Sequence, residues 1–241
     1  LSDWNAVIDE IYYEVKHLLP FSQDRAPSTA FCLLLRLLTL RMTEHQMNLT
    51  LNHSDSPYIR AIGFLYLRYA GPPERMYEFI RPFLQDEEEI TIEPGHRGKP
   101  ISMGEFVRRL FSGRDFHGTP LPRLPQQTER EIQVKILQAD KIAERAFHHH
   151  KNDHRMRQFQ KLGTTVMALY EDEENPLQWY KGVVDRVITR DEATGAMYKY
   201  PRFVVTFTEY GNTETVTLGE MDEVNGRWRD EGVTGGGSRE Q

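Results

Sequence analysis

Apolar residues recur at helical spacing through the first half of the chain. In the segment NAVIDEIYYEVKHLL they stand at Val7, Ile8, Ile11, Val15 and Leu18, which predicts a helix with one buried face. The run AFCLLLRLLTL is apolar nearly all round, which is typical of a helix at the centre of a bundle. Residues 1–125 are therefore expected to form packed helices.

Capping residues indicate where these helices begin and end. Ser28 and Thr43 are expected to be N-caps, since a side-chain oxygen can accept from the first free amides of a helix. Ser56 followed by Pro57 predicts the start of the helix YIRAIGFLYLRYA, which should end at Gly71.

Beyond this helix the pattern changes. ITIE and KPISM flank PGHRG, which predicts a small β-hairpin standing off the bundle. SMGE has capping-box spacing from Ser102 to Glu105 and should restart a helix. The proline-rich segment HGTPLPRLPQ is not compatible with a helix, and we expect the first domain to end there.

The second half divides into a helix and a group of strands. Residues 126–161 are expected to form one long polar linker helix, because their apolar stripe is thin and then fades. From Leu162 four short β-branched and aromatic segments alternate with turn-like ones, which predicts a small antiparallel barrel over 162–224. Residues 225–241 are expected to be a flexible tail. The fold class is thus α plus β and multidomain.

Composition limits the classes of protein. The chain has 241 residues, 39% hydrophobic and 27% charged, which is enough apolar content for a folded core. Its single cysteine, Cys32, excludes an internal disulfide and, lying in an apolar run, is expected to be buried. No apolar run nears the roughly 18 residues of a membrane helix.

The net charge of −6 is unevenly distributed. Residues 161–241 hold 15 acids and 9 bases, whereas residues 1–160 are balanced. An acidic module favours cationic partners and argues against a nucleic-acid backbone.

Neither catalysis nor metal binding is favoured by the motifs. NHSDS, residues 52–56, contains the residue types of a hydrolase triad, but adjacent residues before a helix are more often caps. His148, His149, His150 and His154 are better explained as a solvated helix surface than as metal ligands, because no third ligand has suitable spacing. We therefore expect no catalytic residues, metal or cofactor.

An acidic run precedes the predicted hairpin. It has no glycine-spaced calcium-loop pattern, so an exposed loop that contacts basic partners is the favoured interpretation. Its members are Asp86, Glu87, Glu88 and Glu89.

The segment TFTEYGNTE, residues 206–214, raises the hypothesis of a cation-binding cage. Aromatic faces attract a poorly hydrated cation through the ring quadrupole. The candidate walls are Tyr170, Tyr180, Phe207 and Tyr210, with Asn212 at the rim as a hydrogen-bonding partner. Spacing alone favours ordinary core aromatics of a small barrel, and the cation-binding cage is the more specific alternative.

The barrel segment also resembles a known family. VMALYEDEENPLQWYKGVV and FVVTFTEYGNTETVTLGEM follow the order of Tudor domains in the survival-of-motor-neuron group over roughly residues 162–224. The resemblance implies a cage for symmetrically dimethylated arginine at the same five positions. Tyr170 stands where the family often has Trp, and Phe207 where Tyr is common, but both keep an aromatic face.

The helical half resembles the pre-mRNA-processing factor 38 family, in particular its metazoan B-type branch. The resemblance covers about residues 1–125 and is most specific in DSPYIRAIGFLYLRY. It implies a nuclear, non-enzymatic splicing factor that acts in spliceosome activation as a protein-binding scaffold.

Three functions are weighed against one another. The first is a splicing scaffold whose Tudor module reads methylarginine, for example on tails of spliceosomal core proteins. The second is a scaffold whose Tudor fold is only structural. The third is an RNA-binding protein that uses the helical domain, which the neutral charge of that domain disfavours.

Overall fold

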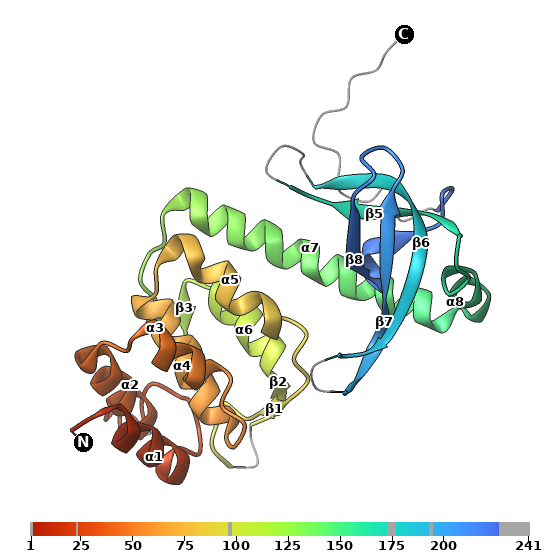
Figure 1. The fold of residues 1–241 in the computed structure, drawn as a ribbon. Coiled ribbons are helices and arrows are strands. Elements are labelled where there is room, and N and C mark those ends of the chain that lie inside the picture. The colour runs from red at the N-terminus through yellow and green to blue at the C-terminus, as the bar shows by residue number, and fades with distance from the viewer. Residues whose placement is uncertain (1, 23, 96–97, 173–176, 193–194, 227–241) are drawn as a thin grey trace. The chain divides into compact units, whose positions relative to one another are not determined.

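The computed structural model describes residues 2–22, 24–95, 98–172, 177–192 and 195–226 (Figure 1). By contacts the chain divides into two compact units, Leu1–Gln138 and Ala139–Gln241, named here the helical unit and the sheet unit. The expected tail lies outside the described residues from position 227 onward. None of the helices in the described ranges is both long and apolar enough to cross a membrane.

The helical unit is built from helices whose starts follow the predicted caps. The helices are α1 Trp4–Glu14, α2 Thr29–Leu40, α3 Glu44–Leu51, α4 Pro57–Ala70, α5 Met76–Ile80 and α6 Met103–Ser112, with 3₁₀ turns η1 Pro73–Arg75 and η2 Arg81–Phe83. Ser28, Thr43, Ser56 and Ser102 each accept a bond from a backbone amide of the helix that follows. These four predicted caps are confirmed.

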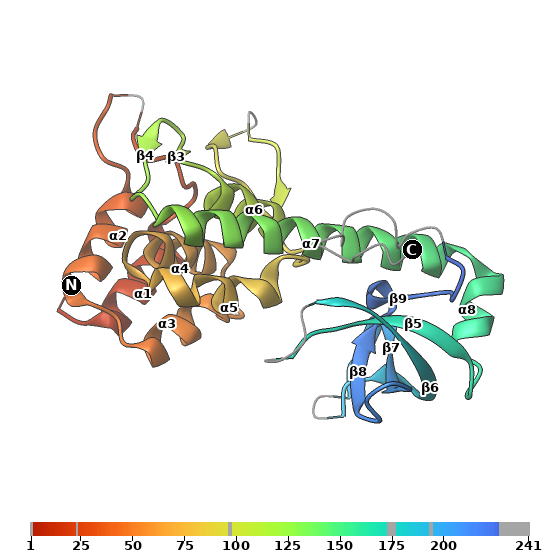
Figure 2. The same ribbon diagram turned by 90° about the horizontal axis from the view of Figure 1, so that it is seen from above.

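The centre of the helical unit is α4. Every residue from Ile59 to Arg68 is buried, and α1, α2, α3 and α6 all pack against this helix (Figure 2). The prediction that α2 is the central helix, with Cys32 buried, is wrong. Because α2 packs on α1 and α4 through one face only, Cys32 is exposed and Leu35 is 65% exposed.

Two small hairpins complete the helical unit. The strands β1 (Glu89–Ile90) and β2 (Ile101–Ser102) pair antiparallel, which confirms the predicted pairing. The hairpin does not stand off the bundle, because Ile90 and Ile92 are buried and the Leu18 amide donates to the Ile92 carbonyl. A second pair joins β3 (Asp115–Phe116), just before the proline-rich segment, to β4 (Thr119–Pro120) within it.

The expected linker helix is interrupted. Helix α7 runs from Gln126 to Lys151, and α8 from Asp153 to Phe159. Asn152 lies between them, and its side-chain oxygen accepts a hydrogen bond from the backbone amide of Arg155 at 3.1 Å. An asparagine that caps a new helix in this way competes with continuation of the old one, which explains the break.

The sheet unit contains a five-stranded antiparallel sheet in the order β8-β7-β6-β5-β9. The strands are β5 Thr165–Tyr170, β6 Gln178–Arg190, β7 Met197–Phe207, β8 Thr213–Thr217 and β9 Met221–Asp222, with the 3₁₀ turn η4 (Leu218–Glu220) before β9. Among the described pairings, β8 and β9 each have one neighbour, so the ladder does not close. The antiparallel sheet is confirmed, and the closed barrel is not.

The core of the sheet unit includes helical residues. Ala146 of α7 and Phe159 of α8 are buried together with Val184, Phe203 and Val205 of the strands. The C-terminal part of α7 is therefore one wall of this core.

Candidate functional site: an aromatic cluster at one end of the sheet

Strand alternation brings the predicted aromatic residues to one place. In β5, Val166 and Ala168 face the core, and Tyr170 follows on the same face. On β7 the alternation that buries Phe203 and Val205 ends at Phe207. Tyr180 lies across from Ala168 in the β5–β6 ladder. The rings thus close one end of the sheet core.

The four rings form a compact group, named here the aromatic cluster: Tyr170, Tyr180, Phe207 and Tyr210. Their paired centroids lie between 5.0 Å (Tyr170–Phe207) and 6.5 Å (Tyr180–Phe207) apart. Tyr170 and Tyr210 are the nearly parallel pair, with centroids at 6.3 Å and planes at 29°. Tyr180 meets both of these rings edge-on, at 5.9 Å and 5.5 Å.

A tight turn between β7 and β8 places Tyr210 over the end of the core. The amide of Gly211 donates to the Phe207 carbonyl at 2.7 Å, and the amide of Phe207 donates to the Asn212 carbonyl at 2.9 Å. Gly211 has φ +73°, a left-handed conformation that glycine adopts without strain. The turn is tied to β6 because the Thr208 hydroxyl donates to the Lys181 carbonyl at 2.8 Å.

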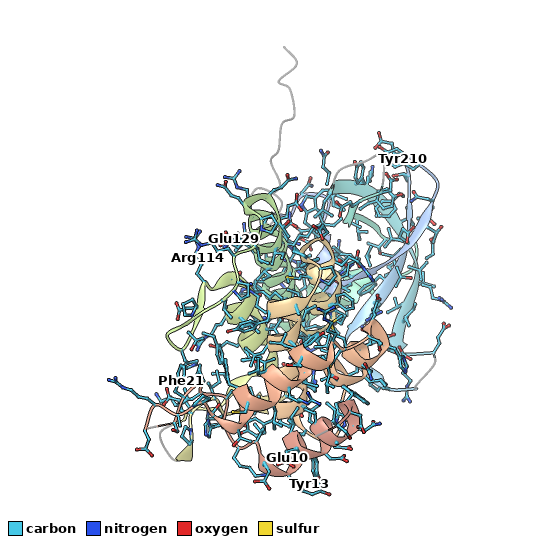
Figure 3. All side chains as sticks on the ribbon, turned by 90° about the vertical axis from the view of Figure 1, so that its left-hand side faces the viewer. Glu10, Tyr13, Phe21, Arg114, Glu129 and Tyr210 are labelled. Carbon is cyan, nitrogen blue, oxygen red and sulfur yellow. The ribbon has the colours of Figure 1, made fainter. Side chains whose placement is uncertain are left out.

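The cluster has a buried floor and an open rim. Phe207 is 0% exposed, whereas Tyr210 is 46% exposed and points outward at the edge of its unit (Figure 3). Tyr170 and Tyr180 are intermediate. The side-chain oxygen of Asn212 is buried and has no hydrogen-bond partner within the described part of the chain. A buried acceptor without a donor is costly, and a ligand N–H would relieve that cost.

Acidic neighbours fix one ring and set the charge of the site. The Tyr170 hydroxyl donates to the Asp172 carboxylate at 2.6 Å. This bond, with partial burial, raises the pKa of Tyr170 to about 12. Burial and the charge of Glu209 raise the pKa of Tyr210 as well. Both phenols are therefore neutral at physiological pH, and the surrounding carboxylates favour a cation.

The specific role of Asp172 was not visible in the sequence. It stood in an acidic run, Glu171–Glu174, in which no member could be distinguished, and Glu173 and Glu174 lie outside the described residues. The hydrogen bond to a phenol two residues earlier depends on where the chain turns after β5.

The other candidate sites are local structures. In NHSDS the Ser54 hydroxyl donates to Asp55 at 2.8 Å, and the Asp55 amide donates to His53 at 3.3 Å, so these residues bond within their own loop. The interpretation of the histidines needs one correction. His148, His150 and His154 are exposed, but His149 is 0% exposed. No group of three potential metal ligands occurs among the described residues.

His149 is buried because it joins α7 to the sheet. Its Nε2 lies 2.9 Å from the Met221 carbonyl, and its Nδ1 lies 3.2 Å from the Arg155 guanidinium. A neutral ring with its proton on Nε2 satisfies both contacts. Burial lowers the pKa of His149 to about 4, which keeps this neutral form. Nearby, Arg145 donates to the Gly219 carbonyl at 2.6 Å.

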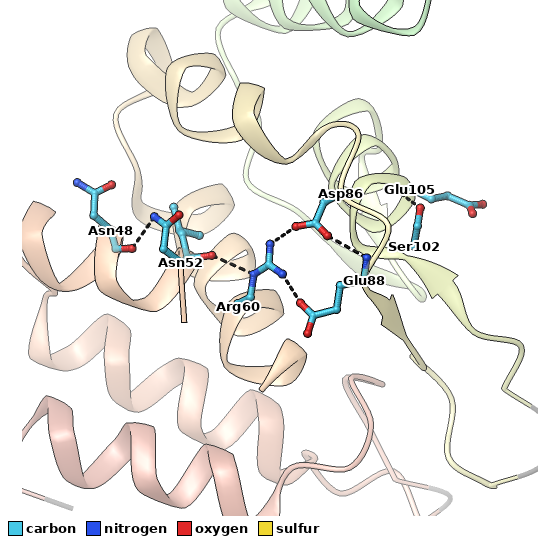
Figure 4. Close-up of polar contacts among 8 residues, drawn as sticks. Asn48, Asn52, Arg60, Asp86, Glu88, Ser102 and Glu105 are labelled. Carbon is cyan, nitrogen blue, oxygen red and sulfur yellow. Dashed lines mark hydrogen bonds and ion pairs between the residues drawn. The ribbon is translucent and has the colours of Figure 1, made fainter. Parts of the chain in front are cut away.

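The acidic run before the first hairpin is partly used inside the helical unit. Asp86 and Glu88 both form ion pairs with Arg60 of α4 (Figure 4). Arg60 also donates to the Leu51 carbonyl at 3.1 Å. Glu87 and Glu89 are exposed. Two of these four acids thus pair with a buried arginine, and the other two are on the surface.

Comparison with known proteins gives a consistent result for the helical unit. The sequence model of the PRP38 family matches residues 1–134. The chain is 42% identical to the Arabidopsis thaliana protein "Pre-mRNA splicing factor SR-like 1", over 55% of this chain and 34% of that protein. It is 33% identical to the Rattus norvegicus "Pre-mRNA-splicing factor 38B", over 56% of this chain and 29% of that protein. The match thus spans about a third of the length of these relatives.

Two solved structures are similar to parts of the chain. One is the crystal structure of the Snu23-Prp38-MFAP1(217-258) complex of Chaetomium thermophilum, with a TM-score of 0.49 and 21% identity over 56% of this chain and 71% of that one. The other is the crystal structure of the extended Tudor domain from BmPAPI, with a TM-score of 0.21 and 17% identity over 45% of this chain and 50% of that one.

Proposed function

The chain belongs to the PRP38 family, and on that premise we propose that it is a non-enzymatic pre-mRNA splicing factor whose sheet unit binds methylated arginine. The helical unit acts as the spliceosomal scaffold, in spliceosome activation, and binds other spliceosomal proteins. Its relatives are named as splicing factors. This role places the protein in the nucleus.

The observation that carries the methylarginine proposal is the aromatic cluster with its unpaired Asn212 oxygen. A planar guanidinium between two parallel rings needs about 3.5 Å on each side, or roughly 7 Å between rings. Tyr170 and Tyr210 are 6.3 Å apart and nearly parallel, so a small outward movement of Tyr210 would admit the ligand. Tyr210 lies on a turn and is half-exposed, which makes it the wall that can move.

Each component of the cluster has a role in this proposal. The flanking rings bind the cation through their faces, at roughly 0.5–2 kcal/mol per contact. The Asn212 oxygen accepts a hydrogen bond from a guanidinium N–H. Methylation leaves the charge in place and lowers the cost of desolvation, so the methylated form is preferred. With so few contacts, we expect a Kd on the order of 10 μM to 1 mM for one site.

Titration with Arg-Gly peptides tests the binding. We expect the symmetrically dimethylated peptide to bind at least several-fold more tightly than the unmodified one, and Tyr180→Ala and Tyr210→Ala to remove that preference. Tyr13→Ala is the matched control, since Tyr13 is 67% exposed in the helical unit. Equal binding of both peptides, or none at millimolar concentration, would leave the sheet unit as a purely structural module.

The splicing role has a separate test. Nuclear extract depleted of this protein should lose splicing of a model transcript and regain it when the protein is returned. If the depleted extract splices normally, the proposed role in splicing is wrong, whatever the peptide titration shows.

A further inference from the structure

The charges of the sheet unit are segregated along its sequence. Residues 162–177 and 203–226 contain nine acids and no lysine or arginine, and they include the acidic neighbours of the aromatic cluster. Apart from Lys161, the bases among the described residues of the sheet unit lie instead in α7, α8 and the β6–β7 hairpin.

Exposed bases lie along the β6–β7 hairpin and at the C-terminal end of α7. We name this group the basic hairpin surface; its members are Lys151, Arg186, Arg190, Lys199 and Arg202 together with the imidazole ring of His150, all exposed. The His150 ring lies 5.1 Å from that of Tyr200, which joins α7 to β7. Arg186 and Arg202 share the outer face of the hairpin, since Arg202 pairs with Ile188, two residues along from Arg186.

Aromatic rings lie among these cations. The Lys199 ammonium is 5.7 Å from the centre of the Tyr200 ring, and the Arg202 guanidinium is 4.2 Å from that of Tyr198. The His150 ring of α7, which contacts the Tyr200 ring, adds a third ring to this group. Cations interleaved with flat rings are the arrangement by which proteins hold single-stranded nucleic acid, because phosphates pair with the cations and bases stack on the rings.

The acids near this surface are exposed or bonded to hydroxyl groups in the contacts described here. Arg186 and Glu192 are 3.6 Å apart, but their side chains are 63% and 76% exposed, and such surface pairs contribute little. Asp191 accepts from the Tyr198 hydroxyl at 2.9 Å. Asp185 accepts from Thr206, and Asp153 is exposed on α8.

Distance separates the surface from the acidic end of the same unit. Strand β7 runs from Met197 beside the basic hairpin surface to Phe207 in the aromatic cluster. Arg202 is five residues before Phe207 on this strand, or roughly 17 Å at about 3.3 Å per residue, and Arg186, which pairs with Val204, is roughly 10 Å from the level of Phe207. The screening length at physiological salt is about 8 Å, so the net negative charge of the unit does not decide what binds here.

We propose that the basic hairpin surface binds single-stranded RNA through its phosphates, with bases stacking on the exposed His150 ring and the half-exposed rings of Tyr198 and Tyr200. The site is distinct from the aromatic cluster and does not depend on methylarginine binding. An acidic protein segment would use the cations alone, whereas RNA uses the cations and the rings together.

Fluorescence anisotropy of the full chain with a labelled twelve-nucleotide single-stranded RNA tests the proposal. We expect binding that weakens steeply between about 50 and 200 mM salt. Lys199→Glu/Arg202→Glu should weaken binding by about tenfold or more at low salt. Lys16→Glu/Arg25→Glu is the matched control, because it makes the same change of charge at exposed positions of the helical unit and should leave binding within about twofold.

A double variant that removes the two charges without reversing them keeps the test valid if charge reversal disturbs folding. Lys199→Gln/Arg202→Gln should have an unchanged melting temperature and a log–log salt slope smaller by about 1.4, from two lost phosphate contacts at about 0.7 each. His150→Ala should weaken binding several-fold without changing that slope. Tyr210→Ala should bind RNA as the parent does, which separates this site from the methylarginine proposal.

Three results would overturn the proposal. The first is no RNA binding at low salt. The second is equal loss in the hairpin pair and the matched control. The third is competition by poly-glutamate as effective as by unlabelled RNA at equal charge, which would assign the surface to an acidic protein partner.

Discussion

Both units of this protein contain an aromatic group, and the two groups differ in exposure and in the chemistry of their rings. In the helical unit, Phe116 lies 6.1 Å from Phe31 and 6.0 Å from Phe106. These separations match those of the aromatic cluster in the sheet unit. Ring distance alone therefore does not distinguish a core from a site.

The two groups differ in chemistry and exposure. The helical group consists of phenylalanines, and Phe106 and Phe116 are 1% and 6% exposed. The aromatic cluster has three tyrosines, and Tyr210 at its rim is 46% exposed. An unpaired buried atom does not separate the two groups by itself: among the described residues, Thr119 Oγ1, across the hairpin from Phe116, has no hydrogen-bond partner, and neither has the Asn212 oxygen. Partial exposure together with an unmet acceptor is what indicates a ligand.

The largest expected effect is a difference in stability between variants at the buried Phe207 and at the exposed Tyr210. Phe207→Ala should destabilise the sheet unit by about 3–5 kcal/mol, because it empties a fully buried position. Tyr210→Ala should cost less than about 1 kcal/mol and still abolish methylarginine binding. Urea unfolding, with hydrogen exchange to locate the loss in β5–β9, measures both. Equal destabilisation would mean that Tyr210 is a core residue.

Replacing one glycine in each unit by alanine tests how closely neighbouring elements pack there. A Cβ on Gly219 would lie 1.9 Å from the Ile142 carbonyl of α7, whereas one on Gly63 would meet the Thr50 methyl at 2.9 Å. Backbone yields less readily than a side chain, so Gly219→Ala should cost about 3 kcal/mol or more and Gly63→Ala about 1 kcal/mol. The reverse order of melting temperatures would show that α7 is not fixed to the sheet as described.

Acid should weaken the sheet unit through His149. The folded unit keeps this ring neutral down to its pKa of about 4, whereas the unfolded chain protonates it near 6.5. The stabilisation is therefore complete above pH 6.5 and is lost as the pH falls to 4, a change of at most about 3 kcal/mol. His149→Gln should flatten this pH dependence, and His154→Gln, at an exposed position, should leave it intact. An unchanged dependence in His149→Gln would contradict the assignment.

The smallest expected effect is the pH dependence of peptide binding. Because the pKa of Tyr170 is raised to about 12, and that of Tyr210 is raised as well, neither phenol ionises below pH 9. Calorimetry between pH 6 and 9 should give dissociation constants for the methylated peptide within about twofold of one another. A tenfold change across that range would place a titrating group in the site.

Local signals in the sequence predicted most of the fold. Caps such as Ser56 and hairpins flanked by glycine follow from neighbours in the chain. The exposure of Cys32 and the burial of His149 did not follow, because each depends on which face of a helix a distant element covers. Polarity predicted that α7 would be a solvated linker, but buried contacts to Gly219 and Met221 hold its end against the sheet.

The candidate site was predictable in its members but not in its geometry. Strand order, the Gly-Asn turn and the Tudor resemblance nominated Tyr170, Tyr180, Phe207, Tyr210 and Asn212, and the structure brings the four rings together; that they bind a ligand stays a prediction. The parallel arrangement of Tyr170 and Tyr210 was not predictable, since it depends on the hydrogen bond to Asp172 and on the left-handed Gly211.

The most direct test of the central claim is an NMR measurement of where the methylated guanidinium lies. A symmetrically dimethylated Arg-Gly peptide with ¹³C-labelled methyl groups would be added to the full chain. Our account predicts nuclear Overhauser contacts from those methyl groups to the ring protons of Tyr170 and Tyr210, with the methyl resonances shifted upfield by the ring faces. Contacts to residues outside the aromatic cluster, or unshifted methyl resonances at millimolar peptide, would contradict it.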